Sequence, residues 1–169
     1  MPPNRTPTRL SPANPPHSQT LPGVGGAKWI PSVPEITGTR ASGAARWLTP
    51  IKAVIQLSLR YKSDDHLWFS FFHEAAHLLL HSKKRTFVSG TEAENDPTED
   101  EANAFAASFL IPRRYETELR ALESLDDIAA FADRIDIAPG IVVGRLQKEG
   151  ILDWSQGNRL KKRFQLVDE

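Results

Sequence analysis

The sequence of 169 residues contains no cysteine. This absence excludes disulfide bonds, metal sites built on thiolates, iron–sulfur clusters and cysteine nucleophiles. A zinc site in this chain would therefore have to be built from histidine and carboxylate side chains. A chain without cysteine also suits a reducing compartment, and we expect a cytoplasmic protein.

The sequence also lacks an excess of either charge and lacks long apolar runs. Its 21 lysine and arginine residues balance 21 aspartate and glutamate residues, so there is no general attraction to nucleic acid or to anionic membranes, and direct nucleic-acid binding is not expected. The longest apolar run falls far short of the roughly 20 residues of a membrane span. Residues 1–18 have no apolar core of the kind found in secretory signals. We expect a protein that stays out of membranes.

Proline is scarce outside one end of the chain, because nine of the 13 prolines lie between Pro2 and Pro34. Residues 1–26 carry too few apolar side chains to offset the entropy lost on ordering. We therefore predict a flexible, proline-rich tail at residues 1–26. Residues 27–169 are predicted to form one domain, which is long enough to bury a stable core.

Hydrophobic patterning predicts a small antiparallel sheet followed by helices, which is an α+β fold. Strands are expected at 28–33, at 43–48 and at 51–60, where Ile51, Ala53, Ile55, Leu57 and Leu59 share one face. The polar stretch 83–95 indicates a loop. Helices are expected from Ser63 or Asp64 to about Ser82, from Asp96-Pro97 to near Pro112, and at 113–122, 125–134, 139–148 and 155–164.

The second half of the first predicted helix contains the pattern H-E-x-x-H at residues 73–77. Positions four apart lie on one helix face about 6 Å from each other, so His73 and His77 can direct both imidazoles at one cation. Glu74 lies one step round the helix, where its carboxylate can take a proton from a water that attacks a carbonyl group. The alternative is a pair of core histidines bonded to backbone carbonyls, which would leave the metal-ligand spacing unexplained.

A catalytic zinc site needs a third protein ligand. His81 lies about 12 Å along the helix axis from His73, too far for the same ion, and is expected to be a C-terminal residue that favours the helix dipole. Glu99, in the first turn of the next helix, is the better candidate because the residues on its stripe near it are small. The alternative role for Glu99 is electrostatic only: a negative charge in the first turn of a helix interacts favourably with the helix dipole. Glu101 lies on another stripe and, with Thr98, fits a capping box.

Two supporting roles complete the predicted site. Asn103, one turn after Glu99, is placed to orient a metal ligand through a hydrogen bond. Peptide hydrolysis also needs a donor for the developing oxyanion. The candidates are Tyr61, Tyr115, Arg60 and Arg145, of which we retain Tyr115 and Arg145.

These residues together resemble the ImmA/IrrE metallopeptidases. The resemblance is carried by HEAAH at 73–77, by E-x-x-A-N-x-F-A-A from Glu99 and by the Phe-Leu-Ile-Pro run at 109–112, and it covers roughly residues 27–165. It implies a zincin-like helical core in which one zinc ion is held by His73, His77 and Glu99, with Glu74 as general base. The spacing of Glu99 and Asn103 is similar to the gluzincin pattern.

The resemblance implies a zinc-dependent endopeptidase that cleaves a regulatory protein, a helix-turn-helix (Xre-type) repressor or antitoxin, in stress responses or toxin–antitoxin loci. In similar regulators a DNA-binding module precedes the peptidase, whereas the proline-rich tail occupies that place here. Either the repressor is a separate protein or the chain is a shortened relic of a fusion.

Two alternatives to proteolysis remain open. One is a non-catalytic regulator that uses the same fold to bind a protein. The other is a DNA-binding regulator that uses the helix-turn-helix rhythm of residues 125–148. The mixed charges of that segment favour helix packing over DNA contact.

Overall fold

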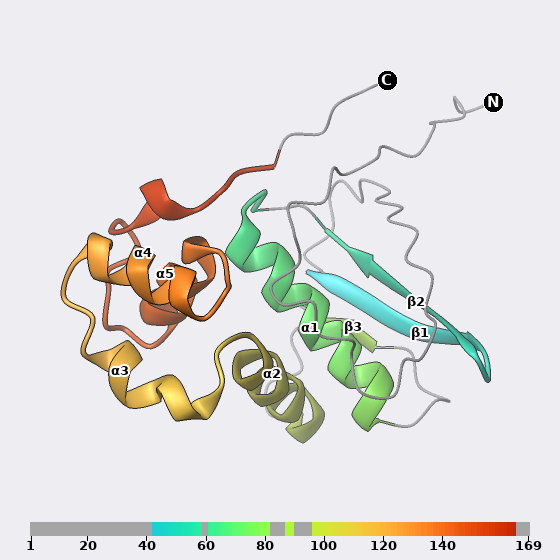
Figure 1. Cartoon of the computed structure of the whole chain (residues 1–169). Coiled ribbons are helices and arrows are strands. Elements are labelled where there is room, and N and C mark those ends of the chain that lie inside the picture. Colours follow the sequence, from blue (N-terminus) through green and yellow to red (C-terminus); the bar gives the residue numbers. More distant parts are fainter. Residues whose placement is uncertain (1–41, 59–60, 82–86, 90–95, 165–169) are drawn as a thin grey trace, which may run out of the picture.

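A computed structural model of the protein describes residues 42–58, 61–81, 87–89 and 96–164. The predicted tail at 1–26 and the predicted strand at 28–33 lie outside these residues. Over the described residues the chain forms a small antiparallel sheet and a set of helices, so the α+β prediction is confirmed (Figure 1).

The sheet has three antiparallel strands in the order β2-β1-β3. Strand β1 (Gly43–Thr49) forms the centre and pairs with β2 (Lys52–Leu57) on one side and with β3 (Phe87–Ser89) on the other. Strand β3 lies inside the stretch 83–95, so the prediction of an uninterrupted loop is wrong. Three residues that owe their extended shape to pairing with β1 leave no periodic pattern in the sequence.

The second strand is shorter than the predicted 51–60. It begins at Lys52, while Ile51 lies in the hairpin turn and is 94% exposed. The prediction that Ile51 shares a buried face is therefore wrong, and Leu59 lies outside the described residues. Strand β2 is at one edge of the sheet, and residues 53–58 are all half-buried. Because β2 is an edge strand of a small sheet, both of its faces are partly covered, and neither face is clearly buried or clearly exposed.

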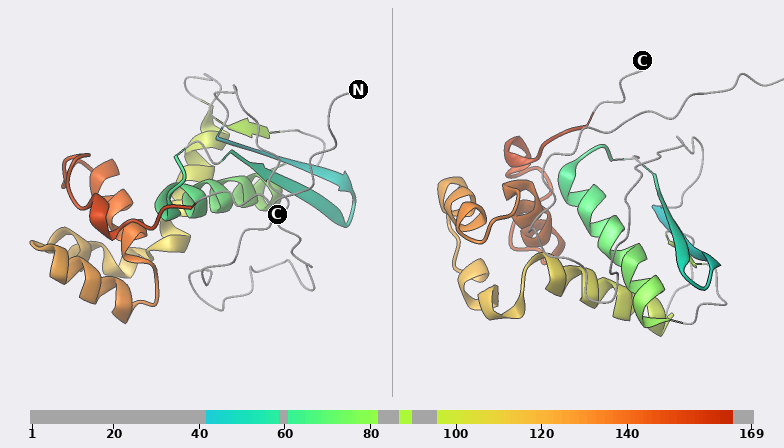
Figure 2. Two further views of the ribbon diagram at one scale, coloured as in Figure 1. Left: turned by 90° about the horizontal axis from the view of Figure 1, so that it is seen from above. Right: turned by 45° about the vertical axis from the view of Figure 1, so that its right-hand side comes forward.

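Two long helices follow the first two strands. Helix α1 (Asp64–Leu80) has Ser63 as its N-cap, and α2 (Pro97–Leu110) begins with Pro97 after the capping Asp96. Both helices match the predicted starts. Helix α1 lies between the sheet and the remaining helices, against β1, β2, α2 and α5 (Figure 2). Its middle turns, from Phe71 to His77, are fully buried, so its near-uniform apolar character reflects contact on several sides.

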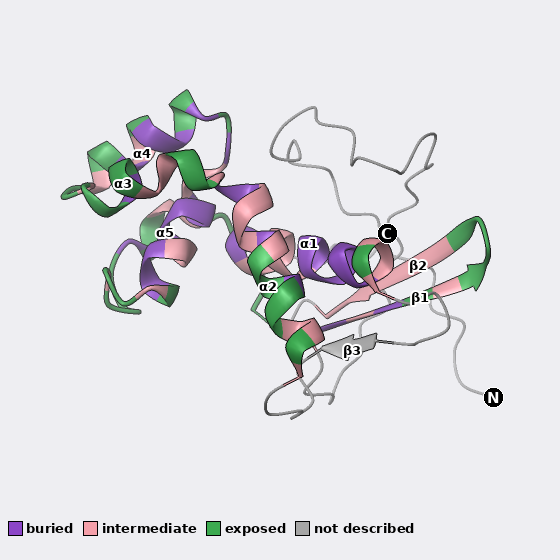
Figure 3. Cartoon of the chain, turned by 90° about the horizontal axis from the view of Figure 1, so that it is seen from below, coloured by how far each residue is buried: buried purple, intermediate pink, exposed green. Residues whose placement is uncertain are grey.

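The C-terminal part is a cluster of short helices: η1 (Arg113–Tyr115), α3 (Glu116–Arg120), α4 (Leu125–Arg134), α5 (Pro139–Lys148) and η2 (Asn158–Leu160). The hydrophobic core joins this cluster to α1 and α2 through residues such as Phe72, Leu110, Phe131 and Val142. Figure 3 shows that the buried residues concentrate where α1 meets these elements. The predicted helices 125–134 and 139–148 are confirmed with the same bounds.

The predicted helix at 155–164 is wrong, because only the short turn η2 forms there. Gly157 adopts φ 74°, in the left-handed region that interrupts a helix. The buried amide of Gln147 also holds the preceding loop, since its Nε2 donates to the carbonyl of Gln156 at 2.7 Å. A hydrogen bond from another helix therefore sets the path of this segment, and that contact has no local sequence signal.

Helix α5 approaches the start of α1 closely through two glycines. A Cβ at Gly140 would overlap Oδ1 of Asp64, and a Cβ at Gly144 would lie 2.7 Å from Oδ2 of Asp65. Both acidic side chains are buried there, and burial raises the pKa of the Asp64 carboxyl above its ordinary value. The glycine spacing of α5 therefore serves helix packing.

Candidate metal centre

Three potential metal-binding side chains from α1 and α2 converge on one point. The Nε2 atoms of His73 and His77 are 3.1 Å apart. Glu99 on α2 places its Oε2 3.1 Å from Nε2 of His73 and its Oε1 3.2 Å from Nε2 of His77. The four-residue spacing on α1 and the close approach of α2 produce this arrangement, as the sequence pattern predicts for two histidines and a carboxylate.

The arrangement fits zinc in size and in chemistry. Two ligands of a tetrahedral ion at about 2.0–2.1 Å would be roughly 3.3 Å apart, and the three distances among these donors are 3.1, 3.1 and 3.2 Å. Neutral imidazole and carboxylate are common zinc ligands, and three protein ligands is the number found in catalytic sites. His77 is fully buried, whereas the Glu99 side chain is 31% exposed, so the donor group opens to solvent on the side of α2.

Asn103 fixes the tautomer of one of these histidines, His73. Its Oδ1 lies 3.0 Å from Nδ1 of His73, so Nδ1–H donates to the amide oxygen and the lone pair is left on Nε2. That lone pair is the one directed at His77 and Glu99. Asn103 is one turn after Glu99 on α2, and the structure therefore places it in contact with His73.

The structure also brings together two residues whose contacts the sequence analysis missed. His81, the C-cap of α1, has its Nδ1 2.9 Å from Nδ1 of His77 and its Nε2 3.1 Å from Oε2 of Glu101. Glu101 therefore faces α1, and the prediction that it forms a capping box with Thr98 is wrong. Asp96 caps α2 instead, accepting from the Thr98 backbone N–H at 2.9 Å. The signal that indicates the His81 contact is its spacing, four residues after His77.

Glu74, the residue after His73 on α1, is fully buried. Its side chain lies against Gly43 of β1, where an added Cβ would be 2.6 Å from Oε1. The central strand therefore has a glycine, which lacks a side chain, at the point where the Glu74 carboxylate lies. Sequence reasoning treated Gly43 only as the start of a strand, because a glycine at a strand end has many explanations.

The two predicted oxyanion donors lie in the helical C-terminal part. Tyr115 packs edge-on against Phe131, with ring centroids 5.9 Å apart, and Arg114 lies over its ring at 4.6 Å. Arg145 bonds to Glu149 and donates to the carbonyl of Ala107 at 3.3 Å.

These contacts keep Arg145 away from the donor group. Ala107 is eight residues beyond Glu99, about 12 Å along the axis of α2. Among the described contacts of Tyr115 and Arg145, none is to His73, His77 or Glu99. Of the other two candidates, Tyr61 stacks on His66 with ring centroids 4.3 Å apart, and Arg60 lies outside the described residues.

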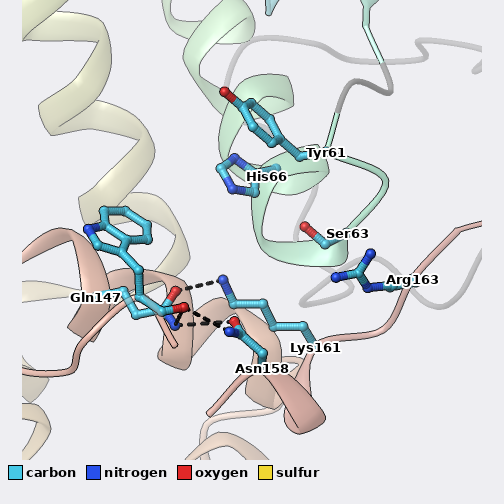
Figure 4. A pocket seen from close by; sticks show the side chains of 8 residues that line it. Tyr61, Ser63, His66, Gln147, Asn158, Lys161 and Arg163 are labelled. Carbon is cyan, nitrogen blue, oxygen red and sulfur yellow. Dashed lines mark hydrogen bonds between the residues drawn. The ribbon is translucent and has the colours of Figure 1, made fainter. Parts of the chain in front are cut away.

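A cavity of about 380 Å³ lies near the start of α1 (Figure 4). Its lining residues are polar or aromatic: Tyr61, Ser63, His66, Gln147, Trp154, Asn158, Lys161 and Arg163. Lys161 is held in its wall by Asp65 Oδ2 at 2.6 Å and Gln147 Oε1 at 2.7 Å. Burial lowers the pKa of His66 below its ordinary value. His66 precedes His73 by seven residues, about 10 Å along the axis, so this cavity is separate from the donor group.

Comparison with known proteins places the donor group inside a peptidase domain. The family model Peptidase_M78, the IrrE N-terminal-like domain, matches residues 34–147. That range includes β1, α1 and α2, and with them all three converging donors. No curated protein sequence matches the chain. None of the helices in the described ranges is long and apolar enough to cross a membrane.

Proposed function

Because the chain belongs to the Peptidase_M78 family of IrrE N-terminal-like domains, we propose that it is a zinc-dependent endopeptidase with one zinc ion per chain. The observation that carries the proposal is the convergence of two Nε2 atoms and one carboxylate at 3.1 to 3.2 Å. His73, His77 and Glu99 would hold the ion, and Asn103 would orient His73. Bound zinc supplies Lewis-acid polarisation of a carbonyl group and lowers the pKa of water.

Glu74 is the proposed general base. It follows His73 directly on α1, so it lies one step round the helix from the face that carries the two histidines. The carboxylate accepts the proton of the attacking water and then delivers it to the leaving amine, so it returns to its starting state after each cleavage. Its burial against Gly43 holds the carboxylate in one position, which favours proton transfer because geometry is limiting.

The proposed substrate is a regulatory protein, such as a helix-turn-helix repressor or an antitoxin. The support for this part is the resemblance to peptidase domains of bacterial regulators. The DNA-binding alternative at residues 125–148 has less support, because α5 buries six of its residues: Gly140, Ile141, Val142, Val143, Leu146 and Gln147. A helix that packs this much of its surface against α1 and α4 has little left for a DNA groove.

The proposal is tested by comparing cells that produce the wild-type chain with cells that produce Glu74→Gln. Mapping of protein N-termini across the proteome should reveal at least one cleavage that occurs only with the wild type. Zinc content of both purified proteins should be equal, because Glu74 is not a proposed ligand. Identical N-termini in the two cell populations, with both proteins folded and loaded with zinc, would favour the non-catalytic interaction module.

A further inference from the structure

We infer that His81 and Glu101 form an outer hydrogen-bond chain that prepares His77 to bind the metal. This inference rests on the proposed zinc site. It assigns a positioning role to two residues that do not themselves belong to the donor group. The chain runs from His77 Nδ1 to His81 Nδ1 at 2.9 Å, and from His81 Nε2 to Glu101 Oε2 at 3.1 Å.

The carboxylate at the end of this chain determines where each proton lies. A carboxylate oxygen accepts hydrogen bonds, so His81 Nε2 carries the hydrogen and donates a hydrogen bond to Glu101. In neutral His81 the other nitrogen, Nδ1, then has a lone pair and accepts. His77 must supply the hydrogen from its Nδ1, and its own lone pair is therefore on Nε2. That atom faces His73 and Glu99.

The tautomer of the other histidine, His73, is fixed in the same way by a single hydrogen bond. His73 donates from Nδ1 to the Asn103 amide oxygen at 3.0 Å. Each proposed histidine ligand thus has an outer partner at Nδ1, and both contacts to α2 come from residues two apart on that helix, Glu101 and Asn103. A metal-binding imidazole generally needs such a partner to fix its tautomer and ring orientation.

The two hydrogen bonds of this outer chain differ in their exposure to solvent. The His81 side chain is 7% exposed, whereas that of Glu101 is 60% exposed. A solvent-exposed polar contact contributes little stability by itself, so the role of the Glu101 hydrogen bond is to fix which ring nitrogen of His81 carries the hydrogen. The link between His81 and His77, shielded from water, is expected to have the larger effect on metal binding.

Three substitutions separate these contributions. His81→Phe keeps a ring but removes the acceptor for His77 Nδ1. His81→Asn keeps an acceptor near the position of Nδ1 and loses the contact to Glu101. Glu101→Gln keeps the shape and removes the charge. Asp100→Asn is the matched control, because Asp100 is an exposed acidic residue in the same first turn of α2.

Zinc affinity is measured by competition with a chromophoric chelator, and the site is also loaded with Co²⁺ to record its visible absorption. We expect His81→Phe to weaken zinc binding about 10- to 100-fold and to shift the cobalt bands. His81→Asn and Glu101→Gln should weaken it less, and Asp100→Asn should match the wild type. Thermal unfolding of the metal-free proteins checks that His81→Phe has not simply destabilised the fold.

The outcomes distinguish this inference from the proposed function. If the wild-type protein binds neither zinc nor cobalt, the proposed zinc site itself is contradicted. Wild-type protein that binds zinc, with His81→Phe equal to it in affinity and in cobalt spectrum, would overturn the outer chain and leave the zinc site standing. If His81→Phe does not fold, the other two variants decide. Zinc affinity equal to wild type in both His81→Asn and Glu101→Gln would then overturn the proposed hydrogen-bond chain.

Discussion

The side chain of Glu74 occupies the space that a Cβ at Gly43 would need, because that Cβ would lie 2.6 Å from Oε1 and 2.8 Å from Cγ of the glutamate. Gly43 is in the central strand of the sheet and Glu74 is in the helix that carries the histidines. The sheet therefore takes part in the site by holding the proposed base. Position 43 therefore requires glycine, because even the methyl group of alanine would overlap the Glu74 side chain.

The first prediction concerns this contact. Gly43→Ala should lower peptidase activity about 100-fold, because a displacement of about 1 Å at a reacting group has an effect of that size. Zinc content should not change, since the donors come from α1 and α2. The measurement is cleavage rate and zinc content of the variant beside the wild type.

A double-mutant cycle supplies the control for that prediction. Gly43→Ala should reduce the free energy of unfolding by about 1–3 kcal/mol through overpacking. The reduction should be smaller in a Glu74→Asp background, where the shorter side chain leaves room. Equal destabilisation in both backgrounds would show that the two positions are not in contact.

The second prediction separates Glu99 from its acidic neighbours on α2. Glu99→Ala should release zinc, because it removes the carboxylate that lies 3.1 and 3.2 Å from the two Nε2 atoms. Asp100→Asn should retain zinc, because Asp100 lies on the exposed side of the same turn. Zinc content after dialysis against a weak chelator measures both, and retention of zinc by Glu99→Ala would exclude Glu99 as the third ligand.

The sequence predicted the convergent donors and the supporting Asn103, and missed the contacts of Gly43, His81 and Glu101. A four-residue spacing on one helix and a small-residue stripe on the next are local patterns, and they led to His73, His77 and Glu99. The pairing of β3 with β1, and the contacts of Gly43 with Glu74 and His81 with Glu101, depend on how distant segments meet. Such contacts leave no periodicity in the chain, so reasoning from local patterns could not place them.

The third prediction concerns the ion pair beneath the start of α1. The side chains of Lys161 and Asp65 are 10% and 7% exposed, with Nζ and Oδ2 2.6 Å apart. Lys161→Met should lower the free energy of unfolding by about 3–5 kcal/mol, because it leaves the Asp65 carboxylate buried without its cation. Urea unfolding measures this loss. The neighbouring Lys162→Met, which alters an exposed side chain, should have little effect, and an equal loss in both variants would contradict the assignment.

The fourth prediction is a pH dependence at the start of α4. Ser124 and Asp127 form a capping box, and the hydrogen bonds from the Ser124 side chain and backbone lower the pKa of the Asp127 carboxyl below its ordinary value of 3.8. The unfolded chain therefore binds this proton more readily than the folded one, so the stabilisation is present above pH 3.8 and is lost as the pH falls through the lowered pKa.

The measurement compares urea unfolding of the wild type and Asp127→Asn across the acidic range. The stability advantage of the wild type should be constant near neutral pH and should shrink as the solution becomes more acidic than the ordinary value. An advantage that grows with acidity would mean that the carboxylate is not the stabilised form.

The metal site itself is tested most directly by elemental analysis of the purified wild-type chain and of His73→Ala, both prepared without metal-affinity resin. The wild type should contain about one zinc ion per chain, the number set by a single three-ligand site, and His73→Ala should contain almost none while remaining folded. A folded wild-type protein without metal, or equal zinc in both proteins, would contradict the assignment of His73, His77 and Glu99 as the zinc ligands.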